Sequence, residues 1–201
     1  MAALSWMRNP ELVGISAIVT GLVEMCEYLK ATIPLGIMYE LGSFAGESTE
    51  VFARYFAVVH AVDPWDNTWL LNALNPNAEH GKRPEDVESS FDERAKAAGN
   101  IIKHKCTSEA EALNVEAGSL DFAYLDAGDH SYDRTVRDFL DWWPRIKSGG
   151  FLGGHDWYIP EIHAADVFPG VNQAVYYVLG QHPEVYGLKV FPDTSWIVRR
   201  P

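Results

Sequence analysis

Hydrophobic residues recur along the chain with two alternating periods, one typical of strands and one typical of helices. Short apolar runs at 36–41 and 58–63 predict buried strands, and the segment 48–56 between them places its apolar side chains on one helical face. Because strand and helix patterns alternate in this way, the sequence favours an α/β fold.

The same alternation continues to the end of the chain. Further helices are predicted over residues 86–99, 131–146 and 171–180, with the segment 147–150 ending the second of them. Further strands are predicted over residues 100–106, 120–126 and 151–156. Two more short strands, 186–192 and 195–200, are separated only by a turn, which predicts an antiparallel pair at the sheet edge.

The length of the chain limits the number of domains. With 201 residues, 47% of them hydrophobic, the chain can bury one sizeable core, and at about 150 residues per domain it predicts a single domain over residues 1–201. Within it, residues 1–35 are expected to form an N-terminal helical segment and residues 36–201 the core.

Charge, hydropathy and cysteine content exclude several classes of partner. A net charge of −12 opposes a nucleic-acid track, which needs clustered Lys and Arg. The apolar run from Leu12 to Val23 is shorter than the about 20 residues needed to cross a bilayer and lacks the basic start of a signal peptide, so no membrane association is expected. Only Cys26 and Cys106 are present, which fits a reducing, cytoplasmic location.

The turn after the first predicted strand carries the first functional signal. In "YELGSFAGESTEVFARYF", Gly42 allows a sharp turn and Gly46 allows the next helix to pack close to its strand. The free N–H groups at that helix N-terminus favour an anionic or carboxylate group. Asp63 ends the second strand 23 positions after Glu40, close to the about 20-residue interval at which an acid binds ribose hydroxyls. A ribose-bearing ligand is therefore predicted.

Four segments together resemble a known family. They are "YELGSFAGESTEVFA", "VHAVDPW", "FAYLDAGDHSYDRTVRDFLDWWPRIKSGGFLGGHDW" and "GVNQAV", in that order. The series, covering residues 37–199, resembles class I S-adenosylmethionine-dependent methyltransferases, in the small-molecule O-methyltransferase-like branch called methyltransferase domain family 24. Phe44 replaces the middle glycine of the usual turn, and the extra residue in "DAGDHSY" leaves open whether Asp126 or Asp129 is the motif's acid.

The resemblance implies a Rossmann-like three-layer sandwich with a mostly parallel seven-stranded sheet, an antiparallel C-terminal edge hairpin and an S-adenosylmethionine site. The implied methionine-binding residues are Glu40, Gly42, Ser43, Gly46 and Ser48. Asp63 would bind the ribose, Trp65 would cover the adenine, Ser108 and Glu109 would contact the adenine edge, and Asp126 would complete the set. For Trp65 the alternative is a packed aromatic, and for Ser108 and Glu109 it is a helix N-cap.

Five titratable residues end the fourth and fifth predicted strands, where the methyl acceptor should enter: Asp126, Asp129, His130, His155 and Asp156. His130 is the preferred general base, because an imidazole with a pKa of about 6.5 is partly neutral at pH 7. Asp126 and Asp156 are expected to assist it. The alternative for His130 is a helix-entry residue that stabilises the loop through a backbone hydrogen bond.

A divalent metal is the competing route. Resemblance to catechol-type enzymes implies Asp126, His155 and Asp156 as ligands of a cation, Mg²⁺ or similar, that would lower the pKa of the acceptor hydroxyl. The imidazole of His155 favours a softer first-row metal over Mg²⁺. The alternative is that Asp156 caps the following segment and His155 donates to a strand carbonyl.

Three functions remain open. The first is O-methylation of a small hydroxylated molecule, for which Trp65, Trp69, Trp157 and Tyr158 suggest an aromatic or glycosidic acceptor. The second is a relative that binds the cofactor but has other, hydroxylase-like chemistry or serves as a non-catalytic binding module. The third is a nicotinamide-dependent dehydrogenase, which the absence of a clean GxGxxG disfavours. A homo-oligomer is compatible with the sequence.

Overall fold

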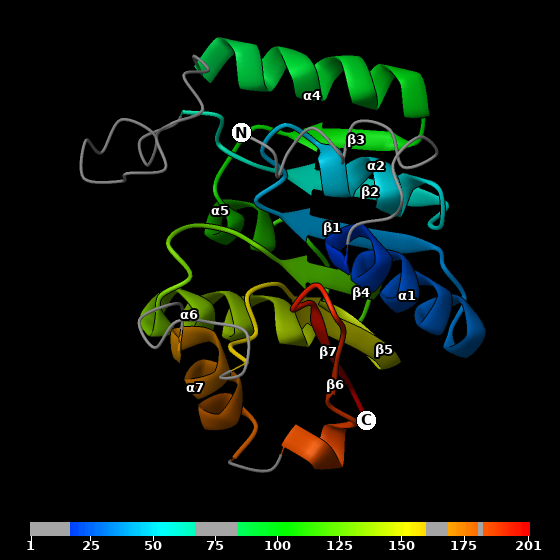
Figure 1. Ribbon diagram of the computed structural model, residues 1–201. Helices are drawn as coiled ribbons and strands as arrows, with labels where there is room; N and C mark the ends of the chain where they lie inside the picture. Colours follow the sequence, from blue (N-terminus) through cyan, green and yellow to red (C-terminus); the bar gives the residue numbers. More distant parts are fainter. Residues whose placement is uncertain (1–16, 67–83, 160–168, 181–182) are drawn as a thin grey trace.

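A single seven-stranded sheet forms the centre of the computed structural model, which describes residues 17–66, 84–159, 169–180 and 183–201 (Figure 1). Its strand order is β3-β2-β1-β4-β5-β7-β6. The strands are β1 (Ile37–Leu41), β2 (Val58–Val62), β3 (Ile101–His104), β4 (Leu120–Leu125), β5 (Ile146–Gly154), β6 (Lys189–Val190) and β7 (Trp196–Arg199). β1 to β5 are parallel, while β7 is antiparallel to both β5 and β6. The predicted sheet with its antiparallel edge hairpin is confirmed.

Helices cover both faces of this sheet. They are α1 (Ala17–Thr32), α2 (Glu47–Ala53), α4 (Pro84–Ala98), α5 (Ser108–Ala112), α6 (Tyr132–Trp142) and α7 (Pro169–Val178), with 3₁₀ turns η2 (Trp143–Arg145) and η3 (Pro183–Tyr186). On one face, apolar side chains of α1 and α2 form a core with the strands, and α4 packs beside them near the β3 edge (Figure 1). On the other face, α5, α6 and α7 enclose a second core. No helix within the described ranges is long and apolar enough to cross a membrane.

The strand predicted over 186–192 is shorter, Lys189–Val190, and three elements within residues 108–154 also differ from the sequence prediction. The helix expected over 131–146 ends at Trp142, because Pro144 cannot continue an α-helix, and the chain passes through η2. Residues 147–150, expected to be only a helix stop, lie within β5. The five-residue helix α5 was not predicted, since it is too short to show a helical period.

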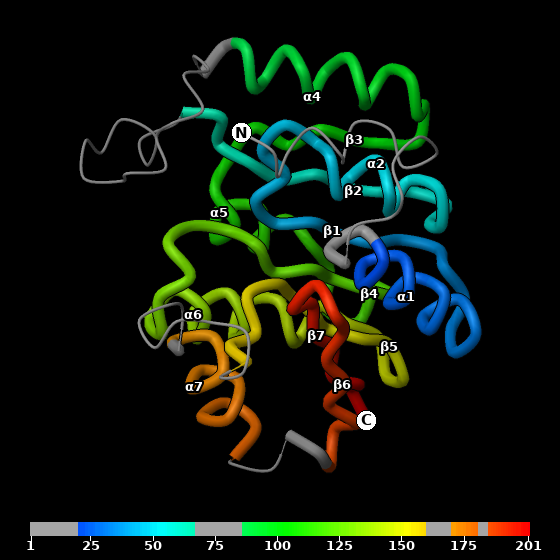
Figure 2. The backbone as a smooth tube through the Cα atoms, viewed as in Figure 1, coloured from blue at the N-terminus to red at the C-terminus, as the bar shows by residue number. Residues whose placement is uncertain are grey.

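The parallel strands bring the predicted site residues to one edge. β1 pairs with β2 on one side and with β4 on the other, so the strand order reverses at β1. Ligands of open parallel sheets bind outside the carboxyl ends of the strands at such a point. Figure 2 shows the connections after β1, β2 and β4 leaving the sheet on the same side.

Candidate functional site

The turn after β1 needs glycine at two positions. Gly42 and Gly46 have φ angles of +90° and +84°, a left-handed backbone that side chains disfavour. A side chain at Gly42 would also place its Cβ 2.1 Å from the carbonyl oxygen of Asp126. The first glycine therefore allows the turn to pack directly on the backbone that follows β4, and the second is the N-cap of α2.

Glu40 is completely buried beneath this turn. The Ser48 hydroxyl donates to its Oε1 at 2.5 Å, and the Thr49 hydroxyl donates to its Oε2. Burial raises the pKa of Glu40 to about 7 in spite of these hydrogen bonds. Glu40 thus stabilises the first turn of α2, with a partner, Thr49, that the sequence analysis did not identify.

Ser43 is the polar residue of the turn whose position suggests a ligand. Its hydroxyl is close enough to Glu40 to favour the ionised carboxyl, yet it is buried and makes no hydrogen bond within the described residues. Because buried hydroxyls in native proteins almost always have a partner, this atom is a candidate to contact a bound molecule.

Asp63, at the end of β2, accepts hydrogen bonds on both carboxylate oxygens. The N–H of Phe44 donates to Oδ2 at 3.0 Å, and the N–H of Trp65 donates to Oδ1 at 2.7 Å. Burial raises its pKa, and these two backbone bonds oppose the shift. Each carboxylate oxygen can accept a second hydrogen bond, so the capacity to bind a ribose diol remains.

Trp65 packs into the protein. Its side chain is 4% exposed, with its ring centroid 4.6 Å from that of Phe91 on α4. The indole N–H donates to the carbonyl of Phe44 at 2.7 Å. These contacts match the packed-aromatic alternative for Trp65, and its predicted contact with adenine stays a prediction.

The segment after β3 also has internal partners. Ser108 donates to Asp138 at 2.6 Å and accepts from the Trp142 indole at 2.8 Å. Glu109 pairs with Arg134 at 2.5 Å. The N-cap of α5 is the neighbouring Thr107, so the alternative role considered for Ser108 belongs to the residue before it.

Three titratable side chains converge beyond β4 and β5. His130 Nδ1 lies 3.1 Å from Asp156 Oδ2 and 3.9 Å from Asp126 Oδ1. Among the described residues, these three are the group of His, Cys, Asp and Glu whose ligand atoms all lie within 4.8 Å of one another. His130 and Asp156 also have left-handed backbones, with φ of 53° and 60°. Strained backbone of this kind is concentrated at functional sites. We call these three residues the acceptor cluster.

His155, predicted as a metal ligand, lies beside this group and not in it. Its Nδ1 is 3.0 Å from Asp156 Oδ1, and its Nε2 is 3.4 Å from the Thr194 hydroxyl in the β6–β7 turn. Burial disfavours its charged form, but the hydrogen bond to Asp156 and the nearby carboxylates prevail and raise its pKa to about 9. Asp156 therefore bridges two imidazoles. The contribution of Thr194 has no local sequence signal.

The structure also separates the two acids of "DAGDHSY". Asp126 joins the acceptor cluster, whereas Asp129 is exposed and accepts a hydrogen bond from the N–H of Ser131 within its own loop. Burial raises the pKa of Asp126 well above its ordinary value; the charge of His155 opposes the shift, and Asp156 adds to it. Burial lowers the pKa of His130 below its ordinary value, against the pull of Asp156.

The aromatic residues predicted around the acceptor are only partly described. Trp157 is buried against Trp196, with ring centroids 6.1 Å apart. The backbone of Tyr158 is fixed by Asn172, which accepts from its N–H at 2.7 Å and donates to its carbonyl at 2.9 Å. Trp69 lies outside the described residues.

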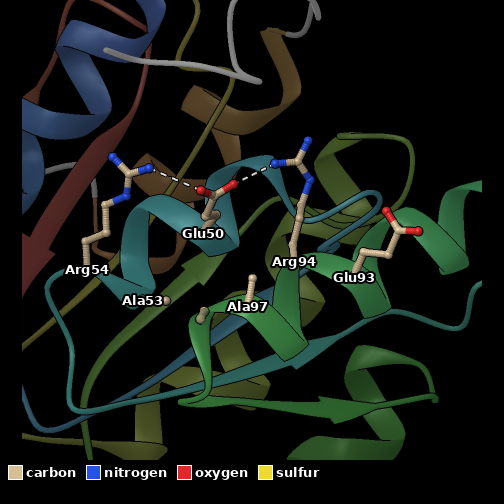
Figure 3. Close-up of a pocket in the computed structure, with 7 residues that line it drawn as sticks. Glu50, Ala53, Arg54, Glu93, Arg94 and Ala97 are labelled. Atoms are coloured by element: carbon tan, nitrogen blue, oxygen red, sulfur yellow. Dashed lines mark hydrogen bonds and ion pairs between the residues drawn. The ribbon is translucent and has the colours of Figure 1, made fainter.

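A groove between α2 and α4 contains none of the predicted site residues (Figure 3). Its two arginines, Arg54 and Arg94, both pair with Glu50, at 3.1 and 2.6 Å. Arg94 also lies 3.8 Å from Glu47, so both arginines of this groove are paired within the protein.

The fold is an α/β sheet with a glycine turn after β1 and a cluster of titratable side chains beyond β4 and β5, both at the carboxyl edge of the sheet. A family model described as a methyltransferase domain matches residues 39–157, more than half of the chain. The chain belongs to this family and is an S-adenosylmethionine-dependent methyltransferase. A comparison with curated proteins finds no match.

Solved structures share the fold at low sequence identity. A TDP-rhamnose 3′-O-methyltransferase of calicheamicin biosynthesis is 18% identical with a TM-score of 0.60, covering 97% of this chain and 85% of that one. The O-methyltransferase TomG from Streptomyces achromogenes, solved with SAM, is 13% identical with a TM-score of 0.60, covering 100% and 91%. An rRNA methylase from Streptococcus thermophilus is 13% identical with a TM-score of 0.58, covering 90% and 97%. Because all three are less than 25% identical to this chain, the likeness shows the fold alone.

Proposed function

We propose that the protein transfers the methyl group of S-adenosylmethionine to a hydroxyl oxygen of a small molecule. The observation that carries this proposal is the convergence of Asp126, His130 and Asp156 directly beside the glycine turn. A backbone hydrogen bond joins this cluster to the glycine turn: the N–H of Asp126 donates to the carbonyl of Leu41, the residue before Gly42, at 2.9 Å. A methyl donor in the turn would therefore lie next to the cluster.

The residues of the turn suit the methionine portion of the cofactor. The N–H groups of Gly42 and Gly46 already donate to the carbonyls of Val62 and Ser43, so these glycines would contribute close backbone approach. The buried hydroxyl of Ser43 would donate to the carboxylate, with Glu40 and Ser48 beneath as the negative and polar support for the ammonium. Asp63 would accept hydrogen bonds from the ribose hydroxyls. When bound, the cofactor supplies an electrophilic methyl group on a sulfonium.

His130 is the group best placed to receive the acceptor's proton. Donation from Nδ1–H to Asp156, at 3.1 Å, would fix the ring orientation and make Nε2 the basic nitrogen. Its lowered pKa keeps the imidazole neutral at pH 7. As the bond from the acceptor oxygen to the methyl carbon forms and the sulfur–methyl bond breaks, the hydroxyl proton would pass to His130.

The same three side chains also fit a divalent cation. They offer two carboxylate oxygens and one imidazole nitrogen within 4.8 Å of one another, a donor set that suits a first-row metal better than Mg²⁺. A bound cation would lower the pKa of the acceptor hydroxyl. In this arrangement His130, rather than His155, would be the nitrogen ligand.

An acceptor screen tests the proposal. The purified protein is incubated with labelled S-adenosylmethionine and sugars, phenols and other small hydroxylated molecules, with and without EDTA. We expect a methyl ether product, and full activity in EDTA would show that the reaction needs no cation. Methylation only of nitrogen or carbon, or binding of NAD in place of S-adenosylmethionine, would contradict the proposal.

A further inference from the structure

The loops after β1 and β2 are joined by a closed set of three hydrogen bonds. Asp63 accepts hydrogen bonds from the backbone N–H groups of Phe44 and Trp65, at 3.0 and 2.7 Å. The Trp65 indole N–H donates to the carbonyl of Phe44 at 2.7 Å. Phe44 and Trp65 both have φ angles of 45°, in the left-handed region. We call Phe44, Asp63 and Trp65 the loop bridge.

The indole of this bridge is fixed from β3 and α4. Lys103 Nζ lies 4.7 Å from the centroid of the Trp65 ring, a cation–π distance. The same ammonium pairs with Glu88 at 2.7 Å and Asp92 at 2.6 Å on α4. Phe91 of α4 contacts the ring from a tilted angle of 50°. The Trp65 ring therefore packs against two elements, β3 and α4, that lie outside the loops that it joins.

We propose that Trp65 is a positioning residue for the cofactor. By fixing Phe44 against Asp63, its indole N–H sets the direction of the Asp63 carboxylate, and Lys103 supports it. The inference rests on the proposed binding of ribose by Asp63. It differs from a stacking role, because Trp65 acts through its N–H and through Asp63, and it predicts an effect confined to ligands that carry the ribose diol.

Trp65→Phe is the direct test, because it retains a ring for Phe91 and Lys103 while removing the N–H donor. The probes are S-adenosylhomocysteine and its 2′,3′-dideoxy analogue, titrated by calorimetry. Loss of one buried hydrogen bond should weaken S-adenosylhomocysteine binding about fivefold. Binding of the dideoxy analogue should be unchanged within about twofold, since it lacks the hydroxyls that Asp63 would contact. Equal weakening of both ligands, or of neither, would overturn the inference.

Two lysines provide a matched pair of milder variants. Lys103→Met removes the ammonium over the indole and should weaken S-adenosylhomocysteine about two- to threefold, again without effect on the dideoxy analogue. Lys105→Met is the control, because Lys105 also pairs with Glu88 at 2.7 Å, whereas the cation over the indole is that of Lys103 in the part of the chain that the structure describes. If Trp65→Phe does not fold, this pair decides: equal affinities of the two lysine variants would overturn the inference.

An Asp63→Asn variant separates this inference from the proposed function. If Asp63→Asn binds S-adenosylhomocysteine as tightly as the wild type, the ribose contact itself is wrong. If Asp63→Asn weakens binding and Trp65→Phe does not, only the positioning role fails. In the double variant, Trp65→Phe should add little to the effect of Asp63→Asn, because both act on the same contact.

Discussion

The carboxylates in the two halves of the sheet's carboxyl edge have different partners. On the cofactor side, after β1 and β2, the oxygens of Glu40 accept from two hydroxyls and those of Asp63 from two backbone N–H groups. On the acceptor side, after β4 and β5, Asp156 faces two imidazoles and lies close to Asp126. Carboxylates held by hydroxyl and backbone N–H donors have a set orientation, which suits ligand binding. Titratable side chains that face one another can exchange protons, which suits proton transfer. The comparison predicts that binding and chemistry can be separated by mutation.

The largest effect is expected at His130. His130→Ala should lower the rate of methyl transfer by about 10² to 10⁴, the usual contribution of a general base, while S-adenosylhomocysteine affinity stays within about twofold. Single-turnover kinetics with an acceptor from the screen measure the first quantity and calorimetry the second. Asp129→Asn is the control, because this exposed acid of the same loop is outside the acceptor cluster. Wild-type turnover in His130→Ala would show that His130 is not the proton acceptor.

The pH dependence of turnover sharpens the assignment within the cluster. The base must be neutral, and the pKa of His130 is lowered from 6.5, so activity should be flat above that pH and fall about tenfold per pH unit below the lowered pKa. The profile is measured as single-turnover rates from pH 4.5 to 9.5. Activity that falls as pH is lowered through about 9 would instead indicate His155 as the base, because its pKa is raised to about 9.

On the cofactor side, Glu40 should affect stability rather than chemistry. The folded-state pKa of Glu40, about 7, lies above its ordinary value of 4.5. The folded state therefore binds more protons than the unfolded state between these values. The stability that protonated Glu40 contributes is lost as pH rises from 4.5 through 7. Glu40→Gln should remove up to about 3 kcal/mol of this pH dependence. Urea denaturation at pH 4.5 and 7.5 measures it. Glu116→Gln, at an exposed site, is the control, and an equal slope in Glu40→Gln and wild type would argue against a perturbed carboxyl.

The smallest effect is expected at the start of α6, on the acceptor side. Ser131 is the N-cap of this helix, and its hydroxyl accepts from the N–H of Arg134 at 3.3 Å. Ser131→Ala should reduce the free energy of unfolding by about 1 kcal/mol and leave S-adenosylhomocysteine binding unchanged. Thermal unfolding and calorimetry measure the two. A clear loss of S-adenosylhomocysteine affinity in Ser131→Ala would contradict the prediction that mutations on the acceptor side leave cofactor binding intact.

The sequence predicted the backbone geometry after β1 and β2 better than the side-chain arrangement after β4 and β5. A glycine required by a left-handed turn and an acid at a fixed interval are local signals, and Gly42, Gly46 and Asp63 show them. The strands were predictable for the same reason, since each is a short apolar run. The indole contacts of Trp65 depend on β3 and α4, which the local sequence does not encode.

On the acceptor side, side-chain direction decides the outcome. Asp156 follows the strand end with a φ of 60°, so the usual alternation of strand side chains does not apply there. His130, also with a left-handed backbone, lies with Asp126 and Asp156, whereas His155 contacts Asp156 and the Thr194 hydroxyl of the β6–β7 turn. Asp126 lies in the acceptor cluster and Asp129 is exposed, a choice that spacing left open.

Calorimetric titration of S-adenosylhomocysteine into wild type, Asp63→Asn and His130→Ala tests the separation of binding from chemistry most directly. We expect one site per chain in the wild type, affinity at least tenfold weaker in Asp63→Asn, and wild-type affinity in His130→Ala. No binding by the wild type, or equal affinity of all three proteins, would contradict the account.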